Sequence, residues 1–295
     1  MFAPPLREHR ELIFEQIAAA KLPRAIVVSS GKGGTGKSFL SVNLACGLGQ
    51  QDQRVLLIDA DFGLANAHLL MGRNPRHDIS HLITGRMPID QILQDCPCNV
   101  KLLGGCSGIA ELSVLSYDQF CIFVSEALKI EQDFDWIVID TSAGITPQVL
   151  SFVTAARELL VVVNPEATSM LDAYAMLKTL FLRNPDAEVG FIANRVKDSI
   201  VAKETYKKLN GAVEHYLNKS LVDTGFIVMD PAVGRSIMHR RPLILDEPSS
   251  DAAFCLKKVV QKILQSKRKD KREKSESYFT RLHREVGYWK NGLHR

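Results

Sequence analysis

Residues 25–38 read AIVVSSGKGGTGKS: an apolar run, a glycine-rich turn and then the start of a helical pattern. The turn has the form G-x-x-x-x-G-K-[ST], whose backbone N–H groups surround nucleotide phosphates at a helix N-terminus. Lys37 brings positive charge to the β- and γ-phosphates, and the hydroxyl of Ser38 is a ligand for Mg²⁺. We therefore predict nucleotide binding by eight consecutive residues: Gly31, Lys32, Gly33, Gly34, Thr35, Gly36, Lys37 and Ser38.

The apolar run before this turn is the first of seven, and amphipathic stretches separate them. Val, Ile and Leu follow one another in these runs without polar alternation, which indicates strands buried on both faces. The pattern predicts an α/β fold, a doubly wound and mostly parallel sheet with helices on both faces. The expected strands are 25–30, 54–59, 100–105, 135–140, 158–163, 188–194 and 221–227, and the helical stretches between them are 38–50, 117–131, 147–156, 168–183 and 198–217. A further helical stretch is expected over 251–265.

Composition excludes several classes of protein. Apolar residues make up 46% of the chain and charged residues 24%, which excludes global disorder and a low-complexity fibre. No apolar run approaches the roughly 18 residues of a spanning helix, and the charged N-terminus is unlike a signal peptide. We expect a cytoplasmic protein without disulfides. Cys96 and Cys98 lack the CxxC spacing of structural zinc sites, so no metal site is expected there.

The chain divides into a large domain and a basic tail. We expect an N-terminal helical extension over 1–23, a nucleotide-binding domain over 24–265 and a tether over 266–277. A C-terminal amphipathic helix is expected over 278–295. Residues 257–295 hold 13 Lys+Arg and 4 Asp+Glu, whereas the whole chain holds 37 and 33. An acidic body with a basic tail points to an anionic partner for the tail.

Three carboxylates follow the ends of predicted strands. Asp59 ends the run at 54–59 and Asp61 follows two residues later, and Asp140 ends the run at 135–140. Carboxyl ends of parallel strands meet at one edge of a sheet, beside the predicted phosphate loop. Mg²⁺ bound between phosphates needs few carboxylates. We predict a metal site of Ser38, Asp59 and Asp140, although a carboxylate at a strand end can also cap a helix.

The stretch KGGTGKS resembles the deviant Walker A box of the MinD/ParA family of ATPases, and the likeness extends from about residue 24 to 264. In that family the extra lysine, here Lys32, reaches the phosphates of a second subunit. The resemblance therefore implies that Mg²⁺ and ATP are the cofactors and that ATP binding forms a homodimer. It names Lys32, Lys37 and Asp61 as catalytic, with Asp61 orienting the attacking water.

Three further segments carry the resemblance. VLLIDADFGLANAHLLMG (55–72) and DWIVIDTSAGI (135–145) match the family's acidic boxes, which implies metal ligation by Asp140 and γ-phosphate sensing by Gly144. ANRV (193–196) matches the adenine box, in which Asn194 reads the base. IVMDPAVGRSIMHRRPLI (227–244) is similar to the loop beside the adenine.

Within the family, GLANAHLLMG and NPEATSMLDAYAMLKTL (164–180) resemble the flagellar number regulators more than MinD. That likeness implies control of flagellar number or placement through an FlhF GTPase or a FleQ-like transcription factor. The DQAxxLR motif that stimulates FlhF is not found at the N-terminus. Alternatives are a MinD-type division-site regulator, a ParA-type DNA-partition ATPase and a metabolic P-loop enzyme. No helix-turn-helix or zinc finger appears, so no sequence-specific nucleic-acid binding is expected.

The tail carries an apolar stripe at helical spacing, made of Tyr278, Phe279, Leu282, Val286, Trp289 and Leu293. An apolar aromatic face beside basic residues is typical of a helix that lies on a membrane. Six basic residues of the tether would each contribute about 1 kcal/mol at an anionic leaflet. We predict peripheral association with the inner face of the plasma membrane through 278–295. The same stripe could instead pack on its own domain or on a protein partner.

Overall fold

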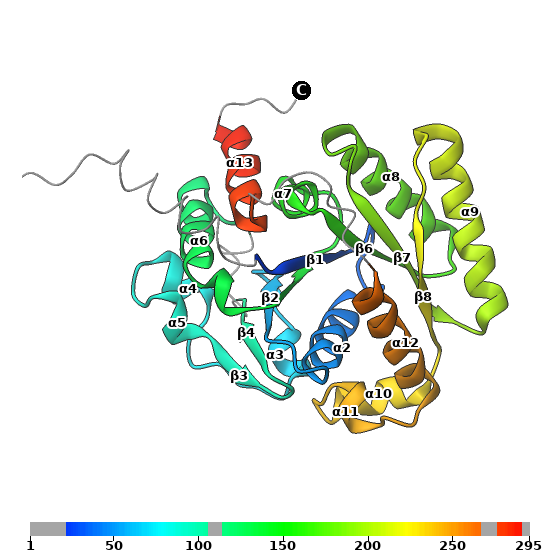
Figure 1. The fold of residues 1–295 in the computed structure, drawn as a ribbon, viewed down its shortest axis with the longest axis horizontal. Coiled ribbons are helices and arrows are strands. Elements are labelled where there is room, and N and C mark those ends of the chain that lie inside the picture. The colour runs from blue at the N-terminus through cyan, green and yellow to red at the C-terminus, as the bar shows by residue number, and fades with distance from the viewer. Residues whose placement is uncertain (1–21, 106–113, 267–275, 291–295) are drawn as a thin grey trace, which may run out of the picture.

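A computed structural model describes residues 22–105, 114–266 and 276–290 (Figure 1). The expected N-terminal helix, most of the tether, Cys106 and the last five residues of the tail lie outside the described residues. Trp289 belongs to a described helix, and its side chain lies outside what the structure describes.

An eight-stranded sheet runs through the molecule in the order β3-β4-β2-β5-β1-β6-β7-β8. All seven predicted strands are present, and every pair among them is parallel. The sequence analysis missed β3, a three-residue edge strand antiparallel to β4, because its QDC sequence has no apolar run. The strands are β1 Arg24–Ser29, β2 Val55–Ala60, β3 Gln94–Cys96, β4 Val100–Leu103, β5 Trp136–Thr141, β6 Glu158–Val163, β7 Glu188–Val196 and β8 Val222–Val228.

Helices cover both faces of the sheet, as the uninterrupted apolar runs predict (Figure 1). The predicted helices correspond to α2 Lys37–Gly49, α6 Tyr117–Ile130, α7 Pro147–Ala155, α8 Ala167–Arg183, α9 Ser199–Leu217 and α12 Asp251–Gln265. The short helices were not predicted, because four to eight residues carry too little periodicity: α3 Ala67–Leu70, α4 Ile79–Ile83, α5 Ile89–Ile92, α10 Pro231–Met238 and α11 Leu243–Asp246.

Two cores hold these layers together. One lies between the sheet and α2 and α12, and includes Leu44, Val138 and Val259. The other lies under α6 to α9 and contains a cluster of phenylalanines whose rings meet edge to face, such as Phe62 and Phe123. Alternate residues of the strands enter opposite cores, which confirms the doubly wound α/β architecture.

The C-terminal helix α13 (Tyr278–Lys290) packs on its own domain, against α6 and α7. Its apolar residues Tyr278, Phe279, Leu282 and Val286 are buried in the second core. In this structure the stripe docks on its own domain, which is one of the alternatives from the sequence, and its binding to a membrane stays a prediction. Burial against α6 and α7 removes the same apolar surface from water that a lipid bilayer would. None of the helices within the described ranges has the length and apolar character needed to cross a membrane.

Candidate nucleotide-binding site

Three neighbouring strands bring the predicted residues to one edge of the sheet. The order β2-β5-β1 puts the carboxyl ends of these strands side by side. In their register Asp59 pairs with Asp140, and Val28 pairs with Asp140 from the other side. The loop from Ser30 to Gly36 follows β1 at this edge and leads directly into α2. The sequence prediction that the loop and the carboxylates lie together is confirmed.

The shape of the loop depends on glycine at two points. A Cβ atom at Gly31 would lie 2.1 Å from the carbonyl carbon of Asp172, so the loop contacts the backbone of α8 directly. Gly36 has φ 95°, a left-handed conformation that side chains other than glycine rarely adopt. The N–H groups that follow begin α2 and have no side-chain cap. Uncapped helix N–H groups provide a site for an anion.

Lys37 is buried at the first turn of α2, with 8% of its surface exposed. Its Nζ donates a hydrogen bond to Oγ of Ser30 at 3.0 Å. Burial lowers the pKa of Lys37, and the negative charges of Asp140 and Asp61 partly oppose that shift. A buried ammonium with acidic neighbours can attract and neutralise a phosphate.

Asp140 has one carboxylate oxygen without a partner. Oδ1 accepts a hydrogen bond from Oγ of Ser41 at 3.1 Å, whereas the buried Oδ2 has no partner among the described residues. Burial raises the pKa of Asp140 to about 6, and the hydroxyl of Ser38 and the ammonium of Lys37 oppose the rise. A free carboxylate oxygen beside a serine hydroxyl fits Mg²⁺, which prefers few protein ligands. Within the described ranges no three His, Cys, Asp or Glu side chains form a metal site by themselves.

Asp59 is engaged by the backbone instead. Its Oδ2 accepts hydrogen bonds from the N–H groups of Asn66 at 3.0 Å and Ala67 at 2.9 Å, and its Oδ1 from that of Asp61 at 3.2 Å. Burial, followed by the charge of Asp140, raises the pKa of Asp59 to about 8. Asp59 thus positions the loop between β2 and α3, while its predicted place in the metal shell stays a prediction.

Asp61 begins that loop and is half-buried. Burial raises its pKa, and the charge of Lys37 opposes the rise. A half-buried carboxylate with a raised pKa beside a phosphate loop is suited to orient water. Its role as the water-orienting group stays a prediction.

Gly144, in the loop after β5, and Asn194, in β7, both contact the phosphate loop. The N–H of Gly144, which has φ 92°, donates to the carbonyl of Ser30 at 3.2 Å. Nδ2 of the buried Asn194 donates to the carbonyl of Thr35 at 2.7 Å. The structure therefore brings both predicted residues to the loop. It gives Asn194 a contact with the loop that sequence reasoning did not foresee.

Lys32 is exposed at the rim of the loop and contacts α8. Its Nζ lies 3.5 Å from Oε2 of Glu166 and 3.3 Å from Oγ1 of Thr168. Sequence reasoning missed Glu166 and Thr168 as partners. The only signal for them was their place directly after β6, at the same edge of the sheet.

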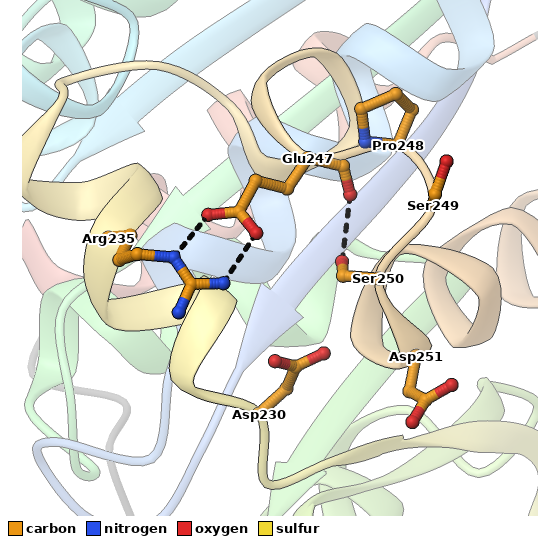
Figure 2. A pocket seen from close by; sticks show the side chains of 7 residues that line it. All are labelled: Asp230, Arg235, Glu247, Pro248, Ser249, Ser250 and Asp251. Atoms are coloured by element: carbon orange, nitrogen blue, oxygen red, sulfur yellow. Dashed lines mark hydrogen bonds and ion pairs between the residues drawn. The ribbon is translucent and has the colours of Figure 1, made fainter.

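A separate polar pocket of about 560 Å³ lies where α10, α11 and α12 meet (Figure 2). Arg235 and Glu247 form a bidentate ion pair across it, with both N–O distances 2.6 Å. Asp230 also lines this pocket. Its side chain caps α10 by accepting a hydrogen bond from the N–H of Ala232. Residues 227–244, expected beside the adenine, contribute Asp230 and Arg235 to this pocket. None of the predicted nucleotide-binding residues lines it.

Comparison with known proteins agrees with this geometry. The family model described as "AAA domain" matches residues 23–184. The antiactivator FleN of Pseudomonas aeruginosa is 34% identical over 84% of this chain and 89% of its own. The flagellum site-determining protein YlxH of Helicobacter pylori is 35% identical over 62% of each chain. The septum site-determining protein MinD of Pyrococcus horikoshii, solved with Mg-ADP, superposes with a TM-score of 0.70 at 22% identity, over 83% of this chain and 97% of its own. The chain therefore belongs to the MinD/ParA family of P-loop ATPases.

Proposed function

We propose that this chain is a Mg-ATP-dependent dimerisation switch that hydrolyses ATP slowly. The observation that carries the proposal is the exposed ammonium of Lys32 at the rim of the phosphate loop. Two exposed apolar side chains lie in loops at the same edge of the sheet, Leu64 at 74% and Ile145 at 51% exposure. They lie in the loops that follow Asp61 and Gly144. Apolar side chains around a charged rim are typical of a face that a partner covers.

Five of the predicted residues then have separate tasks. The N–H groups at the start of α2 and the ammonium of Lys37 hold the phosphates, and Lys32 adds a charge to the phosphates of the second subunit. Ser38 and Asp140 hold Mg²⁺, which supplies further positive charge to the β- and γ-phosphates. Asp61 orients the attacking water. Phosphoryl transfer depends mainly on such positioning and charge, so no strong general base is needed.

The contact of Lys32 with α8 supports a change of partner on dimerisation. Glu166 and Lys32 are both largely exposed and lie 3.5 Å apart. Exposed ion pairs of this kind contribute only about 0–1 kcal/mol. Lys32 can therefore leave Glu166 for a triphosphate at little cost.

The regulated process that fits best is flagellar number or placement, by analogy with FleN and YlxH. The partner is then an FlhF GTPase or a FleQ-like transcription factor. Likeness to a septum site-determining MinD keeps a division-site regulator as the alternative. Affinity capture from the native cell with the Asp61→Ala protein and ATP separates these outcomes. Recovery of cell-division proteins without flagellar ones would overturn the flagellar assignment.

Membrane association belongs to the same proposal, with α13 exchanging between two apolar environments. In this structure α6 and α7 cover its apolar face, so lipid binding requires α13 to leave them. Two α13 helices on one ATP dimer would bind a vesicle far more tightly than one. Because truncating α13 would expose the core, the test keeps the helix and replaces the six basic residues of the tether with Gln. ATP-dependent sedimentation with phosphatidylglycerol vesicles should be lost, and its persistence would argue against a contribution of the basic tether to membrane binding.

The dimer is tested by light scattering after size exclusion. Asp61→Ala with Mg-ATP should elute as a dimer, and without nucleotide as a monomer. Lys32→Ala is the matched control, since it should bind ATP through Lys37 yet remain monomeric. Lys37→Ala should lose both ATP binding and dimerisation. Monomeric Asp61→Ala at saturating ATP would reject the switch.

A further inference from the structure

Two cysteines meet at the edge of the sheet opposite the phosphate loop. Cys98 lies in the turn between β3 and β4, and Cys46 lies in the last turn of α2. Both contribute to the core on the α2 face, where Cys46 is fully buried and Cys98 half-buried. Neither residue has a role in the proposed nucleotide chemistry.

The contact between the two segments is unusually close. A Cβ atom at Gly49, at the end of α2, would lie 1.6 Å from the carbonyl oxygen of Cys98 and 3.3 Å from its Cβ. Cys46 precedes Gly49 by three residues, so the two positions lie on the same face of the helix. Sγ of Cys46 also lies 3.8 Å from Sδ of Met71. The turn therefore packs on the face of α2 that carries the Cys46 thiol.

The backbone at Cys98 is in an uncommon conformation. Cys98 has φ 60° and the next residue, Asn99, has φ 55°. Asparagine tolerates the left-handed region, but a cysteine there costs about 1 kcal/mol or more. Strain of this kind is kept where it orients a particular side chain. Here it accompanies the approach of the Cys98 thiol to Cys46.

The two thiols lie close enough to affect each other's pKa. A hydrogen bond between them is the first cause of both pKa shifts, since it lowers the pKa of Cys98 to about 7 and raises that of Cys46. Of the two thiols, Cys98 therefore loses its proton more readily and Cys46 retains its own. The thiolate is the reactive form, and Cys98 has about tenfold more of it at neutral pH than a cysteine with a pKa of about 8.5.

We propose that Cys46 and Cys98 form a reversible redox pair, in which a hydroperoxide oxidises Cys98 and Cys46 then closes a disulfide. The Cys98 thiolate attacks the peroxide O–O bond, which breaks to give a sulfenic acid and, with hydrogen peroxide, water after protonation. The Cys46 sulfur then attacks the Cys98 sulfur, and the hydroxyl leaves as a second water with the Cys46 proton. Two thiols and one peroxide thus yield one disulfide and two waters.

The neighbouring Cys96 provides a matched control. It lies in β3, two residues before Cys98, and burial raises its pKa. The chemistry therefore predicts a thiol that is slow to react at Cys96 and fast at Cys98. Cys96→Ser and Cys98→Ser change the same atom at neighbouring positions, and only the second removes the reactive sulfur.

The test uses the full-length protein with hydrogen peroxide, followed by alkylation, proteolysis and mass spectrometry. The expected product is a peptide pair joined through Cys46 and Cys98, lighter by two hydrogens and released by dithiothreitol. Cys96→Ser should keep the cross-link and Cys98→Ser should abolish it. Alkylation of Cys98 before oxidation should be about tenfold faster than that of Cys96 at pH 7.

Three results would overturn the proposal. The first is a cross-link that survives Cys98→Ser. The second is sulfinic acid at Cys98 without any disulfide to Cys46. The third is equal alkylation rates at Cys96 and Cys98. Circular dichroism of Cys98→Ser shows whether the fold is retained, and Cys98→Ala repeats the test if serine disturbs the turn.

Discussion

The side-chain amide of Asn194 holds the phosphate loop through the carbonyl of Thr35, with Nδ2 and the oxygen 2.7 Å apart. Asn194 is in β7, two strands from the β1 that carries the loop. The neighbouring Gly36 makes this approach possible, because a Cβ there would lie 2.2 Å from the same Nδ2. The hydrogen bond from Asn194 to the loop therefore requires a residue without a Cβ at position 36.

Asn194→Asp should weaken ATP binding by about tenfold, because a carboxylate cannot donate to Thr35 and the loop loses about 1–1.5 kcal/mol of fixation. Titration calorimetry with ATP and with GTP measures the effect. An equal loss for both nucleotides assigns Asn194 to the loop, and a loss for ATP alone assigns it to the adenine, its role from the sequence analysis. Unchanged affinity for ATP and for GTP would contradict both the loop role and the adenine role of Asn194.

Gly31→Ala should lower the free energy of unfolding by about 2 kcal/mol, because the new Cβ would overlap the backbone at Asp172. Gly33→Ala is the control, since its nearest neighbour, Cβ of Ala143, lies at an ordinary 4.0 Å. Urea unfolding without nucleotide checks both variants. Equal stabilities would show that the loop does not pack on α8 in solution.

Glu131 makes stability depend on pH. It is fully buried beside α13, and burial raises its pKa from 4.5 to about 7 against the opposing effects of Ser277 and Arg281. The unfolded chain ionises near pH 4.5 and the folded protein near 7, so stability falls as pH rises between these values. Above pH 7 the buried carboxyl of Glu131 is ionised, and its ionisation lowers the free energy of unfolding by up to about 3 kcal/mol.

Glu131→Gln removes this titration and should stabilise the protein at pH 8 by up to about 3 kcal/mol, with little effect at pH 4. Urea unfolding across this range measures it, and the exposed Glu204→Gln on α9 is the control. If the free energies of unfolding of wild type and Glu131→Gln change with pH in the same way, Glu131 is not buried under α13.

Phe279→Ala should cost about 3 kcal/mol if α13 is docked, because the ring is fully buried and lies 6.3 Å from that of Phe123. Arg284→Ala, on the exposed side of the same helix, is the control. A change below about 0.5 kcal/mol in Phe279→Ala would mean that α13 does not pack on the domain in solution.

The strands and long helices were predictable because the spacing of apolar residues along each segment shows which of its side chains are buried. Val138 and Ile139, for example, are in a run without polar alternation, and both faces of β5 are indeed covered. The antiparallel β3 and short helices such as α10 were not, because too few residues carry a period. The loop, Lys37 and Asp140 were predictable from order along the chain, since parallel strands deliver their carboxyl ends to one edge.

For the tail, sequence and structure answer different questions. The stripe from Tyr278 to Val286 determined that one face of this helix must leave water, since apolar area drives burial whatever covers it. Only the tertiary structure decided that α6 and α7 cover it, because that choice depends on surfaces more than a hundred residues away. In the same way, local sequence determined a phosphate loop, while the partners of Lys32, Asp59 and Asn194 depended on which side chains and backbone groups the fold brought beside them.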